Sequence, residues 1–305
     1  MPPTPRQVRF HAAEYGSRND AGGPLEVVGD RWDPEGGSAG TVLLLHGGGQ
    51  ARGSWTRSAA TLAGQGWTAL ALDQRGHGES DWSADGDYSI DAFVADVRAV
   101  SRAVAAEQGR PPVLVGASFG GWISLIAEGE GEGDAYARGL VLVDITHRTE
   151  REGTDRIAAF MLAHRAGFAD LGEVADALHE YQPDRPRQTD HAKLARNVRQ
   201  HADGRWYWHW DPQFMGSLGG TTGRGPVVTP ERLADAARKI AVPTLVVRGR
   251  QSDVVSLEAV HEMLDLIPGS TFADVADAGH MVVGDDNDVF AGALLGLLDS
   301  VAANG

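Results

Sequence analysis

Short apolar runs recur along the chain and alternate with segments of helical periodicity. From Thr41 onward the runs are nearly continuous in apolar residues, which is typical of strands buried on both faces of a parallel sheet. Residues 89–107, by contrast, place their apolar side chains on one face of a helix. Strands are predicted at residues 25–28, 41–45, 68–72, 112–115, 140–143 and 244–247, with a weaker one at 271–275.

This alternation predicts an α/β fold with a doubly wound, mostly parallel sheet and helices on both faces. The first two strands have no helix between them and are expected to form an antiparallel edge. Between about residues 146 and 224 the chain becomes polar, and it is mostly helical where it shows any period. We therefore interpret residues 1–145 and 226–305 as the core domain and residues 146–225 as an inserted, mainly helical cap domain. Such a cap would cover the C-terminal end of the sheet, where open α/β sheets bind ligands.

Ser118 is the strongest candidate for chemistry. It stands at the centre of a Gly-Ala-Ser-Phe-Gly sequence at residues 116–120, after a predicted strand and before an apolar segment. The pattern G-x-S-x-G arises by chance in a chain with 40 glycines. A strand before it and a helix after it instead indicate a tight turn that exposes the serine hydroxyl.

A serine hydroxyl becomes a good nucleophile when a histidine removes its proton and a carboxylate orients that histidine. His280 follows the last predicted strand in the sequence Ala-Gly-His, which lets a loop present the ring. Asp253, in the loop after the 244–247 strand, is the favoured carboxylate, because a loop apex orients its side chain more freely than a strand end. Asp144, at the end of the 140–143 strand, is the alternative catalytic acid.

A glycine-rich turn after the 41–45 strand can supply backbone N–H groups to a developing oxyanion. In this turn, His-Gly-Gly-Gly at residues 46–49, Gly48 is predicted as one donor and Gly49 is less favoured. The amide of Phe119 is predicted as the second donor. His46 is expected to hold the turn through its ring.

Substrate contacts are predicted at Gly49, Trp122, Trp208 and Trp210. The last two belong to an aromatic run, Trp-Tyr-Trp-His-Trp, at residues 206–210. This run would either line an acyl pocket or pack the cap onto the core, and the sequence favours neither interpretation.

Composition narrows the class of protein. The length of 305 residues suits one large α/β domain with an insertion. Because the chain has no cysteine, disulfides, a thiolate nucleophile and cysteine-ligated metals are excluded. The formal net charge of −15 argues against binding to nucleic acid or to an anionic membrane. No apolar stretch approaches the length of a membrane span and no secretory signal is visible, so a cytoplasmic location is expected.

Four motifs occur in the order that the α/β-hydrolase superfamily shows, and the chain resembles that superfamily over about residues 25–298. They are the turn at 46–49, the Asp-Gln-Arg-Gly-His-Gly-Glu-Ser segment at 73–80, the sequence around Ser118, and Asp253 with His280. The resemblance implies an eight-stranded sheet. Relatives that open epoxides or carbon–halogen bonds have an aspartate nucleophile, so Ser118 disfavours those reactions. The His-Gly-Gly-Gly turn, followed by Trp55, is also similar to the loop of meta-cleavage-product hydrolases. Around the serine those enzymes usually have Asn before it and Met after it, and Ala117 and Phe119 depart from that pattern.

The resulting prediction is a serine hydrolase that cleaves a small or medium carboxylic ester through an acyl-enzyme, with no metal or organic cofactor required. The alternatives are hydrolysis of a C–C bond, as in the meta-cleavage-product type, and hydrolysis of a lactone. For the C–C reaction, candidate contacts for a substrate carboxylate are Arg185, Arg187, Arg196 and Arg199. The expected partner is a small acyl substrate. The sequence does not specify the acyl or alcohol group, and a homodimer is left open.

Overall fold

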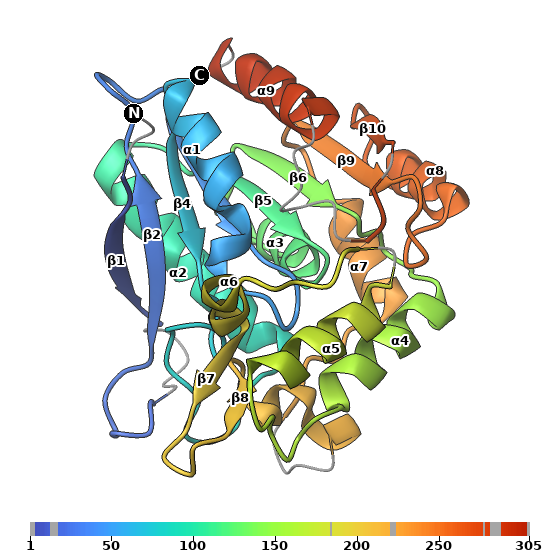
Figure 1. The fold of residues 1–305 in the computed structure, drawn as a ribbon. Helices are drawn as coiled ribbons and strands as arrows, with labels where there is room; N and C mark the ends of the chain where they lie inside the picture. The colour runs from blue at the N-terminus through green and yellow to red at the C-terminus, as the bar shows by residue number, and fades with distance from the viewer. Residues whose placement is uncertain are drawn as a thin grey trace.

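The computed structural model describes residues 4–12, 18–183, 185–219, 224–276, 278–280 and 288–303. Its centre is an eight-stranded sheet in the order β1-β2-β4-β3-β5-β6-β9-β10 (Figure 1). The strands are β1 Arg6–His11, β2 Glu26–Trp32, β3 Thr41–Leu45, β4 Thr68–Leu72, β5 Val113–Ala117, β6 Gly139–Val143, β9 Thr244–Gly249 and β10 Thr271–Val275.

The first two strands pair antiparallel with their neighbours, and every other pairing in this sheet is parallel. The predicted strand positions are therefore confirmed. The predicted antiparallel edge is right for the 25–28 strand (β2) and wrong for the 41–45 strand: β3 lies inside the sheet and pairs parallel with β4 and β5, and the antiparallel partner of β2 at the edge is β1. Strand β1 was not anticipated, because its charged side chains face solvent along an exposed edge and its apolar content is low.

Helices cover both faces of the sheet, as predicted. Helix α1 (Thr56–Gly64) and helix α9 (Asp288–Ala303) pack on one face. The other face is covered by α2 (Ile90–Gln108), α3 (Phe119–Gly129), α7 (Pro230–Ala237) and α8 (Leu257–Leu266). Alternate residues of each central strand enter the two clusters, since successive side chains of a strand point to opposite faces.

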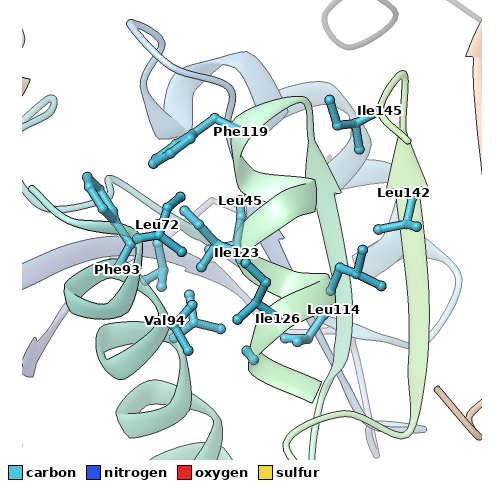
Figure 2. Close-up of a cluster of buried hydrophobic side chains, with 14 of the residues drawn as sticks. Leu45, Leu72, Phe93, Val94, Leu114, Phe119, Ile123, Ile126, Leu142 and Ile145 are labelled. Atoms are coloured by element: carbon cyan, nitrogen blue, oxygen red, sulfur yellow. The ribbon is translucent and has the colours of Figure 1, made fainter. Parts of the chain in front are cut away.

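Helix α2 illustrates how the sequence builds this layer. The side chain of Ser89 caps its first turn by accepting a hydrogen bond from the Ala92 N–H, and Gly109 ends it in the left-handed region at φ 74°. Its apolar face, which includes Phe93 and Val94, packs with α3 over the ends of Leu45 and Leu114 (Figure 2). Burial of such side chains contributes about 1.5–3 kcal/mol each, so this layer is a firm support for the residues above it.

The segment predicted as a cap, residues 146–225, leaves the sheet after β6 and returns before α7; we call it the insertion. It contains helices and a two-stranded antiparallel sheet, β7–β8, which the aromatic run helps to form (Figure 1). Its elements are α4 Arg151–Leu162, α5 Leu171–Tyr181, α6 His191–Leu194, η2 Ala195–Asn197, β7 Val198–Gln200, β8 Trp206–Trp208 and η3 Pro212–Gly219. Whether the insertion is a separate domain with these boundaries stays a prediction.

Within the part of the chain that the structure describes, no helix combines the length and the apolar character needed to cross a bilayer. The compartment in which the protein works stays a prediction.

Candidate active site

Ser118 occupies a strained turn between β5 and α3. Its φ of 48° and ψ of −117° lie where non-glycine residues are rarely found. A Cβ atom at Gly116 would lie 2.3 Å from the Gly120 carbonyl oxygen, and one at Gly120 would lie 2.6 Å from the Leu45 carbonyl oxygen. The two glycines therefore allow the strand and the helix to approach closely enough to hold Ser118 at the apex of the turn.

The imidazole of His280 lies beside the Ser118 hydroxyl. Its Nε2 is 3.1 Å from Ser118 Oγ, and its Nδ1 is 2.7 Å from Oδ2 of Asp144. Because a carboxylate only accepts hydrogen bonds, Nδ1 carries the ring proton, and Nε2 is left to accept the proton of the hydroxyl. The structure thus brings together Ser118 and His280, which are 162 positions apart in the chain, as predicted from the sequence.

Asp144 is almost completely buried, with 1% of its side chain exposed, and three donors surround its carboxylate. Oδ1 accepts the Gly249 N–H at 2.8 Å, and Oδ2 accepts both the Ser252 hydroxyl at 2.6 Å and His280. The backbone of Asp144 is also in the left-handed region, at φ 49°. Ser118 and Asp144 thus sit in matching strained positions at the ends of neighbouring strands, and the Ser118 N–H donates to the Val143 carbonyl between them.

The favoured placement of Asp253 beside His280 is wrong in this structure. Asp253 Oδ2 lies 2.8 Å from an Nη atom of Arg156 on helix α4, and about a third of its side chain is exposed. The turn after β9 aims Ser252 at Asp144 and directs the next residue toward the insertion. A Cβ at Gly153 would lie 2.4 Å from the Asp253 carbonyl oxygen, so α4 packs directly on this loop.

The geometry is compatible with both predicted oxyanion donors. Phe119 is the first residue of α3, where a helix leaves its N–H groups without an intrahelical acceptor. A Cβ at Gly48 would lie 3.9 Å from the Phe119 Cβ, so the two residues adjoin each other. The neighbouring amides are committed elsewhere: Gly47 donates to Gln50 Oε1 at 3.2 Å and Gly49 to His77 Nε2 at 3.1 Å.

Three buried histidines hold the loops around this turn. His46 binds the Gly47 carbonyl through Nδ1 and accepts the Gln74 N–H through Nε2, as expected of a structural residue. His77 contacts the Arg75 carbonyl through Nδ1, and His209 from the insertion accepts the Gly78 N–H. Burial lowers the pKa of each of the three rings to about 3, so all of them are neutral at pH 7.

Sequence reasoning did not single out His77 and His209. The one signal for His77 was its position inside the 73–80 motif. His209 gives no such signal, since its partner Gly78 is 131 positions away along the chain.

Ser118 and His280 open into a cavity of about 1380 Å³ between the sheet and the insertion. Gly49 and Trp122 line this cavity, as predicted, and the Trp122 indole donates to the Thr146 carbonyl at 3.0 Å. The apolar wall near the turn comes from the insertion: a Cβ at Gly49 would lie 3.1 Å from the Met161 methyl group, and one at Gly48 would lie 3.5 Å from the Phe214 ring.

Trp208 and Trp210 are not among the residues that line the described cavity. Their rings stack at 4.9 Å, and Trp208 also packs against Phe160 and Phe168. Trp210 lies behind the cavity wall, where a Cβ at Gly49 would meet its ring at 3.5 Å. The structure therefore favours the packing interpretation of the aromatic run over direct lining of a pocket.

Comparison with known proteins agrees with this architecture. Residues 36–287 match the family described as serine aminopeptidase, S33. An esterase of Mycobacterium tuberculosis is 27% identical over 88% of this chain and 85% of its own length. A 2-(acetamidomethylene)succinate hydrolase of Mesorhizobium japonicum is 29% identical over 71% of this chain and 73% of its own. The crystal structure of an α/β-hydrolase from Novosphingobium aromaticivorans superposes with a TM-score of 0.74, at 23% identity, over 97% of this chain and 99% of that one.

Proposed function

Because the chain belongs to the serine aminopeptidase S33 family and is a hydrolase of the α/β type, we propose that it cleaves a small or medium carboxylic ester through an acyl-enzyme on Ser118. The observation that carries the proposal is the unbroken chain of contacts from Asp144 through His280 to Ser118. This series of contacts ends at the cavity, and the two adjoining backbone amides of Gly48 and Phe119 lie beside it.

In the first half of the reaction, Ser118 Oγ attacks the acyl carbonyl while His280 Nε2 takes the hydroxyl proton. Asp144 keeps the ring in the tautomer with a proton on Nδ1, and its charge stabilises the imidazolium that forms. The amides of Gly48 and Phe119 donate to the oxyanion of the tetrahedral intermediate. His280 then gives its proton to the departing alcohol, and the acyl group remains bonded to Oγ.

In the second half, water attacks the acyl-enzyme and His280 takes a proton from it. Collapse of the second tetrahedral intermediate returns the proton to Oγ and releases the carboxylic acid. The neutral state of the three buried histidines matters here, because an added positive charge beside the turn would perturb the loops that hold Gly48 and Gly49. No step of this reaction needs a group outside the chain and water.

The direct test is the hydrolysis of p-nitrophenyl acetate and p-nitrophenyl butyrate by the wild type and by Ser118→Ala. We expect the substitution to lower kcat by about 10⁴–10⁶-fold, because the nucleophile is lost. Retention of most of the turnover by the Ser118→Ala protein would defeat the assignment.

The same residues would serve a lactone, a C–C bond or a peptide amide, so the bond cleaved is a separate question. A panel of simple esters, lactones and a yellow ring-fission diketone distinguishes hydrolysis of an ester, of a lactone and of a C–C bond. Amino-acid p-nitroanilides test the aminopeptidase activity that the family description names. The ester is favoured because the described site needs no further acid group to expel an alcohol beyond His280.

A further inference from the structure

Most of the charged side chains that line the cavity belong to two groups of different character; Arg57 and Arg185 also line it, and both have contacts of their own. The first surrounds Arg52, which follows the glycine turn. Its guanidinium contacts three carboxylates that also line the cavity: Asp30 at 3.0 Å, Glu79 at 2.8 Å, and Asp73. In this group the charges pair with one another: one guanidinium, that of Arg52, contacts three carboxylates.

The second group is cationic and comes from one stretch of the insertion. Lys193 on α6, Arg196 on η2 and Arg199 on β7 all line the cavity. Among the residues described by the structure, none of the three forms an ion pair or a side-chain hydrogen bond. Arg199 is half-buried, whereas Lys193 and Arg196 are exposed.

Several other arginines of the insertion do have carboxylate partners. Arg187 lies twelve positions or fewer from the same three residues, yet it pairs with Asp176 at 2.6 Å and does not line the cavity. Arg148 pairs with Glu262, and Arg156 with Asp253. In a chain with a net charge of −15, carboxylates are abundant, yet these three cations line one cavity without a carboxylate partner among the described residues.

A recess lined by cations concentrates the electric field and attracts anions, because its low-dielectric walls screen charge less than water does. The cavity also has more room than a short ester needs, since drug-sized ligands occupy sites of about 300–1,000 Å³. The wall next to the glycine turn is apolar, formed by Met161 and Phe214. A substrate that fills the cavity therefore meets the catalytic groups and an apolar wall near its carbonyl, and it also meets the cations of the insertion elsewhere in the lining.

We propose that the substrate carries an anionic group, a carboxylate or a phosphate, joined to the scissile carbonyl by an apolar stretch and bound by Lys193, Arg196 and Arg199. This proposal rests on the proposed ester hydrolysis at Ser118 and adds the class of substrate to it. The apolar stretch packs on the Met161 and Phe214 side, and the anion neutralises the cationic stretch of the insertion.

The binding test uses the Ser118→Ala protein, which holds ligands without consuming them. Isothermal titration compares monomethyl adipate with methyl hexanoate, a neutral ester of similar length, and with a methyl ester that ends in a phosphonate. We expect one of the two anionic esters to bind at least about 10-fold more tightly than methyl hexanoate at low salt, because hydrogen bonds to charged groups are strong. Whichever of monomethyl adipate and the phosphonate ester binds more tightly identifies the anion as a carboxylate or a phosphate.

Adding Arg196→Gln and Arg199→Gln to the Ser118→Ala protein should reduce this preference to about 2-fold or less. Arg187→Gln is the matched control, because it removes a paired arginine of the insertion outside the cavity, and it should leave the preference unchanged. Equal binding of charged and neutral esters, or a preference that survives both substitutions, would overturn the proposal.

A kinetic arm separates this proposal from the reaction itself. The wild type is assayed with the p-nitrophenyl monoester of adipic acid and with p-nitrophenyl hexanoate, and the ratio of their kcat/KM values is measured. Turnover of both esters with a ratio near 1 rejects the anion site and retains the hydrolase. Failure to turn over either ester, together with a clear binding preference, rejects ester hydrolysis and retains the anion site.

Discussion

The loops that follow β6 and β9 each present an aspartate near the carboxyl end of the sheet, and the two carboxylates have opposite environments. Asp144 is buried and accepts hydrogen bonds from His280, Ser252 and the Gly249 N–H. Asp253 is about one third exposed and contacts Arg156 of the insertion. The residue nearer the strand is held by the sheet, and the residue at the loop apex reaches away from it.

This difference shows why freedom of orientation is a poor guide to a catalytic carboxylate. A group that must stabilise an imidazolium works best in a fixed place with its lone pairs already satisfied, because no reorganisation is then needed during the reaction. The ion pair of Asp253 with Arg156 is screened by solvent, and such pairs contribute about 0–1 kcal/mol to stability. Asp253 therefore pairs with α4 of the insertion, and Asp144 is the carboxylate on which the proposed mechanism depends.

The largest effect is expected for Asp144→Asn. An amide in this position offers His280 the wrong partner or the wrong tautomer, and we expect kcat for p-nitrophenyl butyrate to fall on the order of 10³–10⁴-fold. Circular dichroism of the same preparation checks that the fold is retained. Activity within 10-fold of the wild type would mean that Asp144 is not the group that orients the imidazole.

The three buried histidines limit how low the pH can be when variants of the two loops are compared, because they make the folded protein less stable in acid. A histidine in the unfolded chain titrates near 6.5, whereas burial lowers the pKa of His46, His77 and His209 to about 3 in the folded protein. The unfolded chain therefore binds more protons, so stability is lost as the pH falls below about 6.5 and is unaffected by these rings above it. At pH 5.5 each ring raises the unfolding equilibrium constant about 10-fold relative to pH 8.

Urea unfolding at pH 8 and pH 5.5 measures this difference. His209→Gln should reduce the change between the two pH values by about one factor of 10, since one such ring is removed. His191→Gln, at an exposed position, is the control and should leave the change as it is in the wild type. A wild-type protein whose stability is equal at both pH values would contradict the assignment of neutral buried rings.

A smaller effect is expected for Ser252→Ala, which removes the hydroxyl that donates to Asp144 Oδ2 at 2.6 Å. Ser252 is a positioning residue, because it acts on the substrate only through Asp144 and His280. We expect kcat to fall about 10-fold with little change in KM, as befits the loss of one hydrogen bond to a charged group. Ser252→Thr keeps the hydroxyl and should restore most of the rate, whereas an equal loss in both variants would point to disruption of the loop.

The smallest effect is expected for Asp253→Asn. This substitution removes the charge of Asp253 and breaks one partly exposed ion pair. We expect kcat for p-nitrophenyl butyrate to stay within about 3-fold of the wild type and Tm to fall by no more than about 2–4 °C. Arg156→Gln should have a similarly small effect on Tm. A loss of kcat comparable with that of Asp144→Asn would reverse the conclusion drawn from the two loops.

The sheet and the turn at Ser118 could be predicted because their signals are local. Strands buried on both faces have apolar runs, and a serine between a strand and a helix, with glycines two positions away on each side, is typical of a nucleophile turn. The pairing of Ser118 with His280 followed from the order of the motifs. The edge strand β1 was not predicted, because its solvent-exposed residues are mostly polar and strand prediction depends on an apolar pattern.

The choice between Asp144 and Asp253 could not be made from the sequence. It depends on the turn after Gly249, which aims the side chain of Ser252 inward and that of Asp253 outward, and such a direction has no pattern in the residues. The aromatic run was equally ambiguous, because tryptophans such as Trp208 and Trp210 are common both in ligand pockets and in packed cores. Only the structure shows that their rings stack on each other. The His209–Gly78 contact joins segments that no periodicity relates.

The role of Asp144 is tested most directly by the rate at which an organophosphonate p-nitrophenyl ester modifies Ser118. The wild type, Asp144→Asn and Asp253→Asn are compared by release of p-nitrophenolate and by intact mass. Phosphonylation depends on the activated hydroxyl and needs no acyl transfer to water. We predict one adduct per chain, located on Ser118, with the rate lowered at least about 100-fold in Asp144→Asn and within about 3-fold of the wild type in Asp253→Asn. An adduct at another residue, or the reverse order of the two aspartate variants, would contradict this prediction.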